Sequence, residues 1–259
     1  MQLKDKVMIV TGATSGIGEA IARASAAAGA RLVLTGRSVE RGDQVRAACG
    51  AAAQFIPGDV SKAGFADHLV DETVRRCGGL DVLVNNAGVI HRHTAETATD
   101  DEWDYVMAVN VTAVFRLSRA GIKAMKRNGG GVIVNIGSDL ALVGGRNAFA
   151  YCASKGAVAQ MTRAMALDHA RDNIRVNCVC PGEIDTPMTA AGIAHRYRAL
   201  THKQGLKQLA AEIPLGRIAH PDEIAKAVLF LASDDSSFRC HDVRRWRQHS
   251  GIGCTRDRR

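Results

Sequence analysis

Six short apolar runs recur along the first 180 residues, and their apolar positions are continuous rather than alternating with polar ones. Runs of this kind are typical of strands that helices cover on both faces. Longer segments with apolar residues at helical spacing follow the runs. The expected strands are Val7–Val10, Arg31–Leu34, Gln54–Ile56, Val82–Val84, Val132–Ile136 and Arg175–Cys180, and the expected helices are Gly18–Ala28, Val39–Cys49, Ala63–Cys77, Asp101–Lys126, Ala150–Ala170 and Asp222–Ala232.

The alternation of strands and helices predicts parallel strands joined by right-handed crossovers. We therefore predict one α/β domain, a doubly wound parallel sheet of the Rossmann type, over residues 1–238. Neither an internal repeat nor a low-complexity linker divides this span.

Composition and charge narrow the function classes. The 259 residues are 46% hydrophobic and 23% charged, and no run approaches the roughly 18 apolar residues that span a bilayer. Because the charged start does not resemble a secretory leader, we expect a cytoplasmic protein with no membrane partner. Of the net charge of +8, residues 239–259 contribute +5 through seven arginines and two aspartates. The remaining +3, with only 4% aromatic residues, predicts no nucleic-acid partner.

The chain has seven cysteines, and none of them forms a CxxC pair. Cys178 and Cys180 flank one residue of an expected strand, so we expect their side chains on opposite faces and reduced thiols without a shared metal.

The first expected strand runs into a glycine-rich turn, Thr11-Gly12-Ala13-Thr14-Ser15-Gly16-Ile17-Gly18, and then into a helix. Such glycines let the backbone approach a pyrophosphate, which the positive end of the helix then holds. Many strand-to-helix turns need glycine for geometry alone. The context of strand, turn and helix favours a dinucleotide site.

The glycine spacing resembles that of the short-chain dehydrogenase/reductase family, and further motifs follow in family order between residue 5 and about residue 237. Asp59-Val60 resembles the adenine-contacting pair, Asn85-Asn86-Ala87-Gly88 the NNAG motif, and Pro181-Gly182 with Thr186 the segment that holds the nicotinamide carboxamide. The candidate cofactor-binding residues are Gly12, Thr14, Ser15, Gly16, Ile17, Gly18, Arg37, Asp59, Val60, Asn86, Ala87, Gly88, Tyr151, Lys155, Pro181, Gly182 and Thr186.

This resemblance, which extends to 3-oxoacyl-carrier-protein reductases, implies an NAD(P)-dependent alcohol dehydrogenase or carbonyl reductase. Such an enzyme transfers a hydride between NAD(P)(H) and a small ketone or secondary alcohol. The resemblance also implies a homo-oligomer, either a tetramer or a dimer. A nucleotide-binding regulator without turnover is the alternative, and a hydride-transfer assay would distinguish the two.

Asn110, Ser138, Tyr151 and Lys155 match the catalytic tetrad of that family. Tyr151 and Lys155 lie one helical turn apart, and an ammonium there would lower the phenol pKa from its usual value of about 10. Tyr151 could then exchange a proton with a substrate oxygen that Ser138 positions. By resemblance, Lys155 also holds the nicotinamide ribose and Asn110 positions a water. Each residue taken singly favours a packing or capping role, whereas the four at the family spacing favour the catalytic one.

Cofactor choice depends on the end of the second expected strand. Members of the family that prefer NAD carry an acidic residue where this chain has Gly36. Arg37 follows at once, and a guanidinium suits a 2′-phosphate. Many relatives that prefer NADP have a second basic residue where this chain has Ser15, and Arg37 could instead stack on adenine or cap the strand. We expect NADP(H) to be favoured over NAD(H).

Residues 187–214 would form a mobile lid over the substrate. A basic lid would suit an anionic substrate, such as an acyl thioester on a carrier or a sugar acid, and a solvated helix face is the alternative interpretation. His91 and His93 follow the NNAG motif with no partner carboxylate beside them, so we expect loop residues and no metal site. The basic lid residues are His195, Arg196, Arg198, His202, Lys203 and Lys207.

Residues 239–259 depart from the family pattern, which continues with a seventh strand and Val-Asp-Gly-Gly. Their wealth of Arg, Cys, His and Trp is typical of a GC-rich gene read in a shifted frame. For example, the only codon of Trp246, followed by a CGN arginine codon, reads as glycine one base onward. We hypothesise that a small deletion near codon 238 altered or removed the last strand, which would leave an inactive chain. A genuine basic tail is the alternative, and sequencing the gene would distinguish them.

Overall fold

Six parallel strands form the centre of the protein, whose computed structural model describes residues 2–197 and 199–237. The strands lie in the order β3-β2-β1-β4-β5-β6, so the chain starts in the middle of the sheet and winds outward in both directions. This order confirms the predicted doubly wound Rossmann-type sheet. The strands are β1 (Val7–Thr11), β2 (Arg31–Gly36), β3 (Ala53–Pro57), β4 (Val82–Asn85), β5 (Gly131–Ile136) and β6 (Ile174–Val179).

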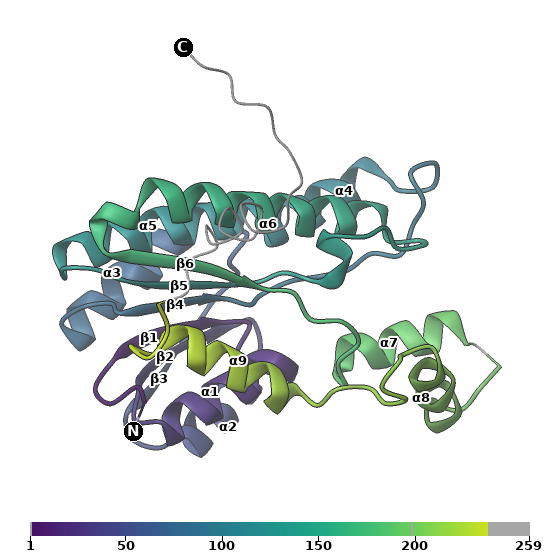
Figure 1. The fold of residues 1–259 in the computed structure, drawn as a ribbon, viewed down its shortest axis with the longest axis horizontal. Helices are drawn as coiled ribbons and strands as arrows, with labels where there is room; N and C mark the ends of the chain where they lie inside the picture. Colours follow the sequence, from purple (N-terminus) through teal and green to yellow (C-terminus); the bar gives the residue numbers. More distant parts are fainter. Residues whose placement is uncertain (1, 198, 238–259) are drawn as a thin grey trace, which may run out of the picture.

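Helices cover both faces of the sheet, with α3, α5 and α6 on one side and α1, α2 and α9 on the other (Figure 1). The helix expected over Asp101–Lys126 is interrupted by a π-helical turn, because one extra residue enters the backbone ladder there. The helical elements are α1 (Gly16–Ala27), α2 (Val39–Cys49), α3 (Phe65–Cys77), α4 (Asp100–Met107), the π-helical turn η1 (Ala108–Thr112), α5 (Ala113–Arg127), the 3₁₀ turn η2 (Asp139–Ala141), α6 (Phe149–Asp168), the 3₁₀ turn η3 (Ala170–Asp172), α7 (Pro187–Arg196), α8 (His202–Ala211) and α9 (Pro221–Ala232).

The apolar runs explain the two cores, because successive strand residues point to opposite faces of the sheet. In β4, Leu83 packs on the side that holds Leu117 of α5, whereas Val84 packs on the side that holds Ile21 of α1. All four side chains are fully or almost fully buried. The continuous apolar pattern of the strands is therefore divided equally between the two helical layers.

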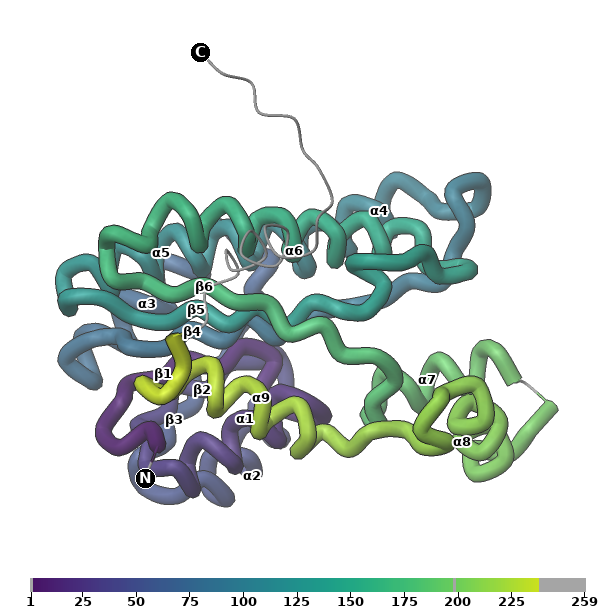
Figure 2. Tube along the Cα trace, viewed as in Figure 1, coloured from purple at the N-terminus to yellow at the C-terminus, as the bar shows by residue number. Residues whose placement is uncertain are grey.

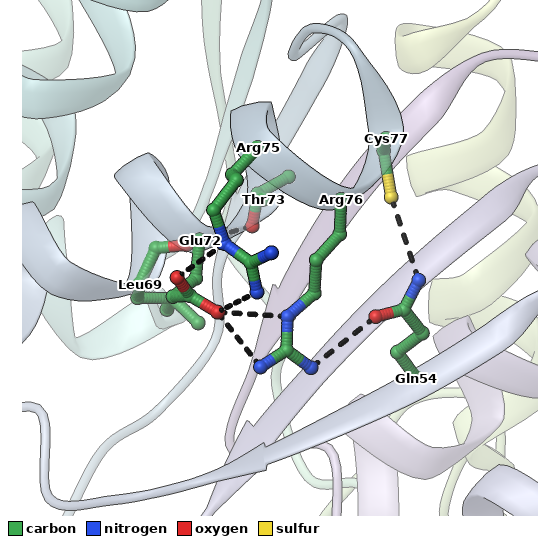
Figure 3. Close-up of polar contacts among 7 residues, drawn as sticks. All are labelled: Gln54, Leu69, Glu72, Thr73, Arg75, Arg76 and Cys77. Carbon is green, nitrogen blue, oxygen red and sulfur yellow. Dashed lines mark hydrogen bonds and ion pairs between the residues drawn. The ribbon is translucent and has the colours of Figure 1, made fainter.

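Polar contacts at the carboxyl end of α3 hold this helix against β3, as Figure 3 shows. Glu72 accepts hydrogen bonds of 2.8 Å from both Arg75 and Arg76. These bonds hold the pKa of Glu72 at about 2. Arg76 also donates to Gln54 of β3 at 3.4 Å, and the Gln54 amide lies 3.8 Å from the Cys77 sulfur. The pattern ties the last turn of the helix to the edge strand.

The segment with α7 and α8 extends away from the sheet at the carboxyl ends of the strands (Figure 2). Its two ends are joined beside the sheet, where Asp185 N donates to Ala219 O at 2.9 Å and Ala219 N donates to Glu183 O at 3.2 Å. The expectations for the last strand and for residues 239–259 lie outside the described residues. Within the described part of the chain, no helix combines the length and apolarity that crossing a membrane requires.

Candidate active site

A cleft of about 300 Å³ lies at the carboxyl ends of the strands. Every candidate site residue lines it except Gly18 and Asn110, which lie behind its wall. The cleft therefore joins the glycine-rich turn, the NNAG segment, the Tyr151–Lys155 turn and the Pro181–Thr186 segment. Sequence analysis missed lining residues for which no motif exists, namely Ser38, Arg41, Gly58, Val89, Tyr105, Val109, Ile136, Gly137, Ile184, Pro187, Met188 and Thr189.

The glycine-rich turn brings its backbone close to the NNAG segment. Gly12 has φ +63°, and a Cβ there would lie 2.8 Å from Ala87 Cα. A Cβ on Gly18 would lie 2.2 Å from Gly12 O. Ser15 is the N-cap of α1, and among the described residues its side chain makes no capping hydrogen bond. The first N–H groups of α1 therefore remain available to an anion in the cleft.

Asn86 holds this arrangement together. Its side-chain amide donates to the carbonyl oxygens of Thr11 at 2.9 Å and Gly12 at 3.2 Å. The Thr11 hydroxyl in turn accepts from the backbone N–H of Asn86 and of Ala87. The NNAG segment thus fixes the glycine turn through hydrogen bonds that bind no ligand themselves.

Arg37 leaves the end of β2 and donates a 2.7 Å hydrogen bond to the Tyr105 hydroxyl at the edge of the cleft. A Cβ on Gly36 would lie 2.6 Å from the Thr14 methyl group, so an acidic side chain at that position would require Thr14 to move. Burial opposes the ionisation of Asp59, but hydrogen bonds from Ser61 outweigh it and lower the pKa of this carboxyl. The cleft end near β2 is therefore lined by two arginines, Arg37 and Arg41, and by the Asp59 carboxylate.

Tyr151 and Lys155 meet on one face of α6, with the Lys155 Nζ 5.6 Å from the centroid of the Tyr151 ring. The expectation that the ammonium would lower the phenol pKa is wrong for the protein alone. Burial raises the pKa of Tyr151 to about 12, against a lowering by its hydrogen bond with Ser138. Lys155 is fully buried, which lowers its own pKa to about 8, and its Nζ donates to Ile136 O at 2.7 Å. Desolvation is the largest cause of both shifts.

Ser138 follows β5 and faces both Tyr151 and its own neighbour. Its hydroxyl donates to the Asp139 carboxylate at 2.8 Å and accepts from the N–H of Leu140 at 3.1 Å. Asp139 and Glu183 both act on Tyr151 through their charges and raise its pKa further. Burial in turn raises the pKa of Glu183. The proton-transfer residues thus lie beside two carboxylates that motif matching did not identify.

Asn110 lies in the π-helical turn η1 and is almost fully buried. Its carbonyl oxygen accepts from Val89 N at 2.9 Å, while its amide donates to Val89 O and to the Ser154 hydroxyl. It therefore joins the loop after the NNAG motif to α6, directly behind Gly88.

Thr186 caps α7 beside the glycine turn, and a Cβ on Gly16 would lie 3.2 Å from its methyl group. The expectation that Cys178 and Cys180 point apart is wrong, because residues two apart in a strand share a face. Their sulfurs lie 3.8 Å apart. A hydrogen bond from Cys178 lowers the pKa of Cys180 to about 6 against its burial. This thiol pair lies next to Gly137 at the floor of the cleft.

The basic lid residues that the structure describes, His195, Arg196, His202, Lys203 and Lys207, are all exposed to solvent. Arg196 pairs with Glu212 at 2.8 Å rather than with a group in the cleft. The expectation for His91 and His93 assumed that no carboxylate lies beside them, and this assumption is wrong: Glu102 of α4 lies within hydrogen-bonding distance of His93.

Known proteins resemble this chain over nearly its whole length. A family model described as enoyl-(acyl carrier protein) reductase matches residues 12–240. The cyclopentanol dehydrogenase of Comamonas testosteroni is 40% identical over 240 residues, which cover 92% of this chain and 93% of the relative. Two solved structures, an actinorhodin polyketide ketoreductase variant with NADPH and the 3-ketoacyl-(acyl-carrier-protein) reductase of Brucella melitensis with NADH, each cover 92% of this chain and 95% of their own.

The ketoreductase has a TM-score of 0.86 at 35% identity, and the Brucella reductase has a TM-score of 0.83 at 33% identity. These similarities span the glycine-rich turn, the NNAG segment and the Tyr151–Lys155 turn, the same segments that meet in the cleft. The chain therefore belongs to the short-chain dehydrogenase/reductase family of oxidoreductases.

Proposed function

We propose that the protein transfers a hydride between NADP(H) and a small ketone or secondary alcohol, with Tyr151 as the proton donor or acceptor. The observation that carries this proposal is the single cleft that holds Ser138, Tyr151 and Lys155 at one end and the glycine-rich turn at the other. Proton transfer and cofactor binding are therefore possible within one site.

The cleft fits a dinucleotide. The open N-terminus of α1 suits a pyrophosphate, and Gly12 permits the close approach that a side chain would block. Arg37 at the β2 end suits a 2′-phosphate, and the lack of room at Gly36 for an acidic side chain supports the preference for NADP(H). Asp59 and Val60 would border the adenine, while Pro181, Gly182 and Thr186 would border the nicotinamide.

When bound, the nicotinamide supplies or accepts the hydride. In the reductive direction the Tyr151 hydroxyl gives its proton to the substrate oxygen, which the Ser138 hydroxyl orients by a hydrogen bond. The raised pKa of Tyr151 keeps this hydroxyl protonated at neutral pH. The Lys155 ammonium, buried beside it, stabilises the phenolate that forms and can also bind the ribose. Asn110 holds the loop behind this site and could orient a water for proton relay.

The charges near Tyr151 favour an uncharged substrate. Asp139 and Glu183 lie close enough to influence the ionisation of Tyr151. The described basic side chains of the lid are exposed, and the charges of Arg92 and Arg196 oppose the burial of Glu183 only in part, because the pKa of Glu183 is still raised. A neutral cyclic or open-chain alcohol, of the kind named for cyclopentanol dehydrogenase, fits this field better than a carboxylate or a phosphate.

We further propose a cytoplasmic homo-oligomer. Phe115 of α5 and Leu167 of α6 are 48% and 44% exposed, which suits contacts between copies of the chain. Cys49, Cys77, Cys152 and Cys180 are free thiols, which suits a reducing compartment. Light scattering on the full chain would give the oligomeric state.

The replacement Tyr151→Phe tests the proposed activity. We expect turnover to fall at least about a hundredfold, because general acid–base catalysis typically contributes about a hundred- to ten-thousandfold. The affinity for NADPH, measured by fluorescence titration, should change little. Lys155→Met should reduce both turnover and NADPH affinity, since one side chain serves both tasks. If Tyr151→Phe retained near wild-type turnover, Tyr151 could not be the proton donor.

The same titration compares NADPH with NADH. We expect tighter binding of NADPH, and Arg37→Ala should reduce this difference. A chain that binds the cofactor but turns over no alcohol or ketone in a hydride-transfer assay would instead support the regulator.

A further inference from the structure

Two histidines from the loop after β4 and one glutamate from α4 bring three ligand atoms together outside the catalytic residues. The Glu102 Oε1 lies 2.9 Å from the His93 Nε2 and 3.5 Å from the His91 Nδ1. All three atoms lie within 4.8 Å of one another. One carboxylate oxygen therefore faces two imidazole nitrogens, an arrangement with the donor types that zinc prefers.

The carboxylate is oriented by the helix that carries it. Glu102 is the third residue of α4, and its Oε2 accepts 3.1 Å hydrogen bonds from both the N–H and the hydroxyl of Thr99. The capping box occupies Oε2 and leaves Oε1 directed at the histidines.

The histidines are also positioned by their surroundings. The His91 ring meets the Tyr105 ring edge to face, with 5.8 Å between the centroids. The backbone oxygen of His93 accepts from Phe149 N, the first residue of α6, at 3.3 Å. These contacts restrict the His91 ring and the backbone at His93.

We propose that His91, His93 and Glu102 bind one divalent cation of the zinc class, with water as the fourth ligand. In tetrahedral zinc sites with bonds of about 2.0–2.1 Å, neighbouring ligand atoms lie about 3.3 Å apart. The two separations that involve Glu102, 2.9 and 3.5 Å, bracket that value, and the two histidine nitrogens lie within 4.8 Å of each other. The side chains are 36%, 37% and 27% exposed, so an ion can enter and keep a water. Mg²⁺ and Ca²⁺ prefer oxygen ligands and would bind poorly.

The site borders the cofactor cleft without belonging to it. Tyr105 contacts His91 on one side, lines the cleft on the other, and holds Arg37 by a 2.7 Å hydrogen bond. Val89, two residues before His91, also lines the cleft. A bound ion joins this loop to α4 and so fixes one wall of the cleft. Metal binding therefore stabilises the folded protein, because the ion binds the folded site and not the dispersed ligands.

Calorimetric titration of the full chain with Zn²⁺ tests the proposal. We expect His93→Ala and Glu102→Gln each to lose one equivalent of bound Zn²⁺ relative to the wild type. Counting the lost equivalent matters, because other histidines and cysteines of the chain can also bind zinc. Glutamine keeps the capping box of α4, so Glu102→Gln separates loss of the ligand from loss of the helix cap.

His220→Asn is the matched control. His220 lies 3.1 Å from the Asp222 carboxylate, and among the described residues no second histidine joins this pair in a three-ligand cluster. Asparagine preserves the capping role of His220. The His220→Asn variant should bind as many equivalents of Zn²⁺ as the wild type. Co²⁺ should give the visible bands of a four-coordinate ion in the wild type and lose them in His93→Ala. Zn²⁺ should raise the Tm of the wild type and of His220→Asn more than that of His93→Ala or Glu102→Gln. Unchanged stoichiometry in both cluster variants, or equal loss in the control, would overturn the proposal.

Discussion

The Lys155 side chain is only 5% exposed, and its ammonium donates a hydrogen bond to Ile136 O at 2.7 Å. Burial lowers its pKa from 10.5 to about 8. Between these two values the unfolded chain binds a proton that the folded protein does not. The free energy of unfolding therefore rises with pH across this interval, and the cost of burying the charge is greatest below pH 8.

This linkage predicts how Lys155→Met differs from the wild type. We expect the free energy of unfolding of the wild type to rise, relative to the variant, by up to about 3 kcal/mol between pH 7 and pH 10. Urea denaturation of both proteins at several pH values measures the difference. A difference that stays constant over this range would show that the ammonium is better solvated than the structure indicates.

The Cys178–Cys180 pair gives a second prediction at this scale. Because the pKa of Cys180 is about 6, roughly nine-tenths of this thiol should be ionised at pH 7, against a few per cent for an ordinary cysteine. Its alkylation by iodoacetamide should therefore hardly accelerate above pH 7. Cys178→Ala removes the hydrogen bond and should move the acceleration to higher pH. Peptide mass spectrometry measures the alkylation rate of each cysteine. Cys49 is the internal comparison, because burial raises its pKa.

At the scale of elements, the effect of replacing a helical glycine depends on what surrounds the helix. Gly18 and Gly156 both lie inside helices, α1 and α6. A Cβ on Gly18 would meet Gly12 O at 2.2 Å and the Asn86 amide at 2.5 Å. At Gly156 the nearest neighbouring atom among the described residues, Ala141 O, lies 4.0 Å away. Alanine has a higher helix propensity than glycine at both positions. Only at Gly18 would its Cβ also collide with the glycine-rich turn.

We therefore expect opposite signs for two alanine substitutions. Gly156→Ala should stabilise the protein by up to about 1 kcal/mol through helix propensity. Gly18→Ala should destabilise it by about 1–3 kcal/mol, because the turn must move, and should weaken NADPH binding. Urea denaturation and fluorescence titration measure both effects. Equal stabilisation by the two substitutions would mean that the turn adapts without cost.

The sequence predicted the bounds of some elements well and missed one element. The strands were predicted to within two residues at each end, because strands covered on both faces leave a continuous apolar pattern. The π-helical turn around Asn110 was not predicted. One extra residue in the backbone ladder leaves the apolar spacing of the flanking helices almost unchanged. The motif matching found Asn110, but its bonds to Val89 depend on that turn.

At the scale of the whole molecule, long-range contacts determine which charged groups surround the site, and sequence motifs do not predict these contacts. Tyr151, Ser138 and Lys155 were identified because their spacing is characteristic of the family. Glu183 lies near Tyr151, and Glu102 lies near His93, because segments distant in the sequence meet in the fold. A short sequence motif does not predict such contacts. The basic composition of the lid likewise did not predict the local field, because its described basic side chains are exposed and Arg196 pairs with Glu212.

The local field makes a final prediction. Replacing Glu183 with glutamine removes one negative charge near Tyr151, so kcat/KM for an anionic alcohol should rise relative to that for a neutral one. Two unit charges about 10 Å apart at an effective dielectric constant of about 20 interact by roughly 1.7 kcal/mol, so the ratio should change by roughly tenfold. Cyclohexanol and 4-hydroxycyclohexanecarboxylate, which differ by one carboxylate, are suitable probes.

The control for this prediction is Asp168→Asn, which removes an equal charge at the far end of α6, about 25 Å along the helix from Tyr151. At that distance salt screens the interaction, so the ratio for the control should stay at the wild-type value. Raising the ionic strength should also reduce the difference between Glu183→Gln and the wild type. If the two variants changed the ratio equally, net charge rather than the position of Glu183 would govern the choice between neutral and anionic substrates.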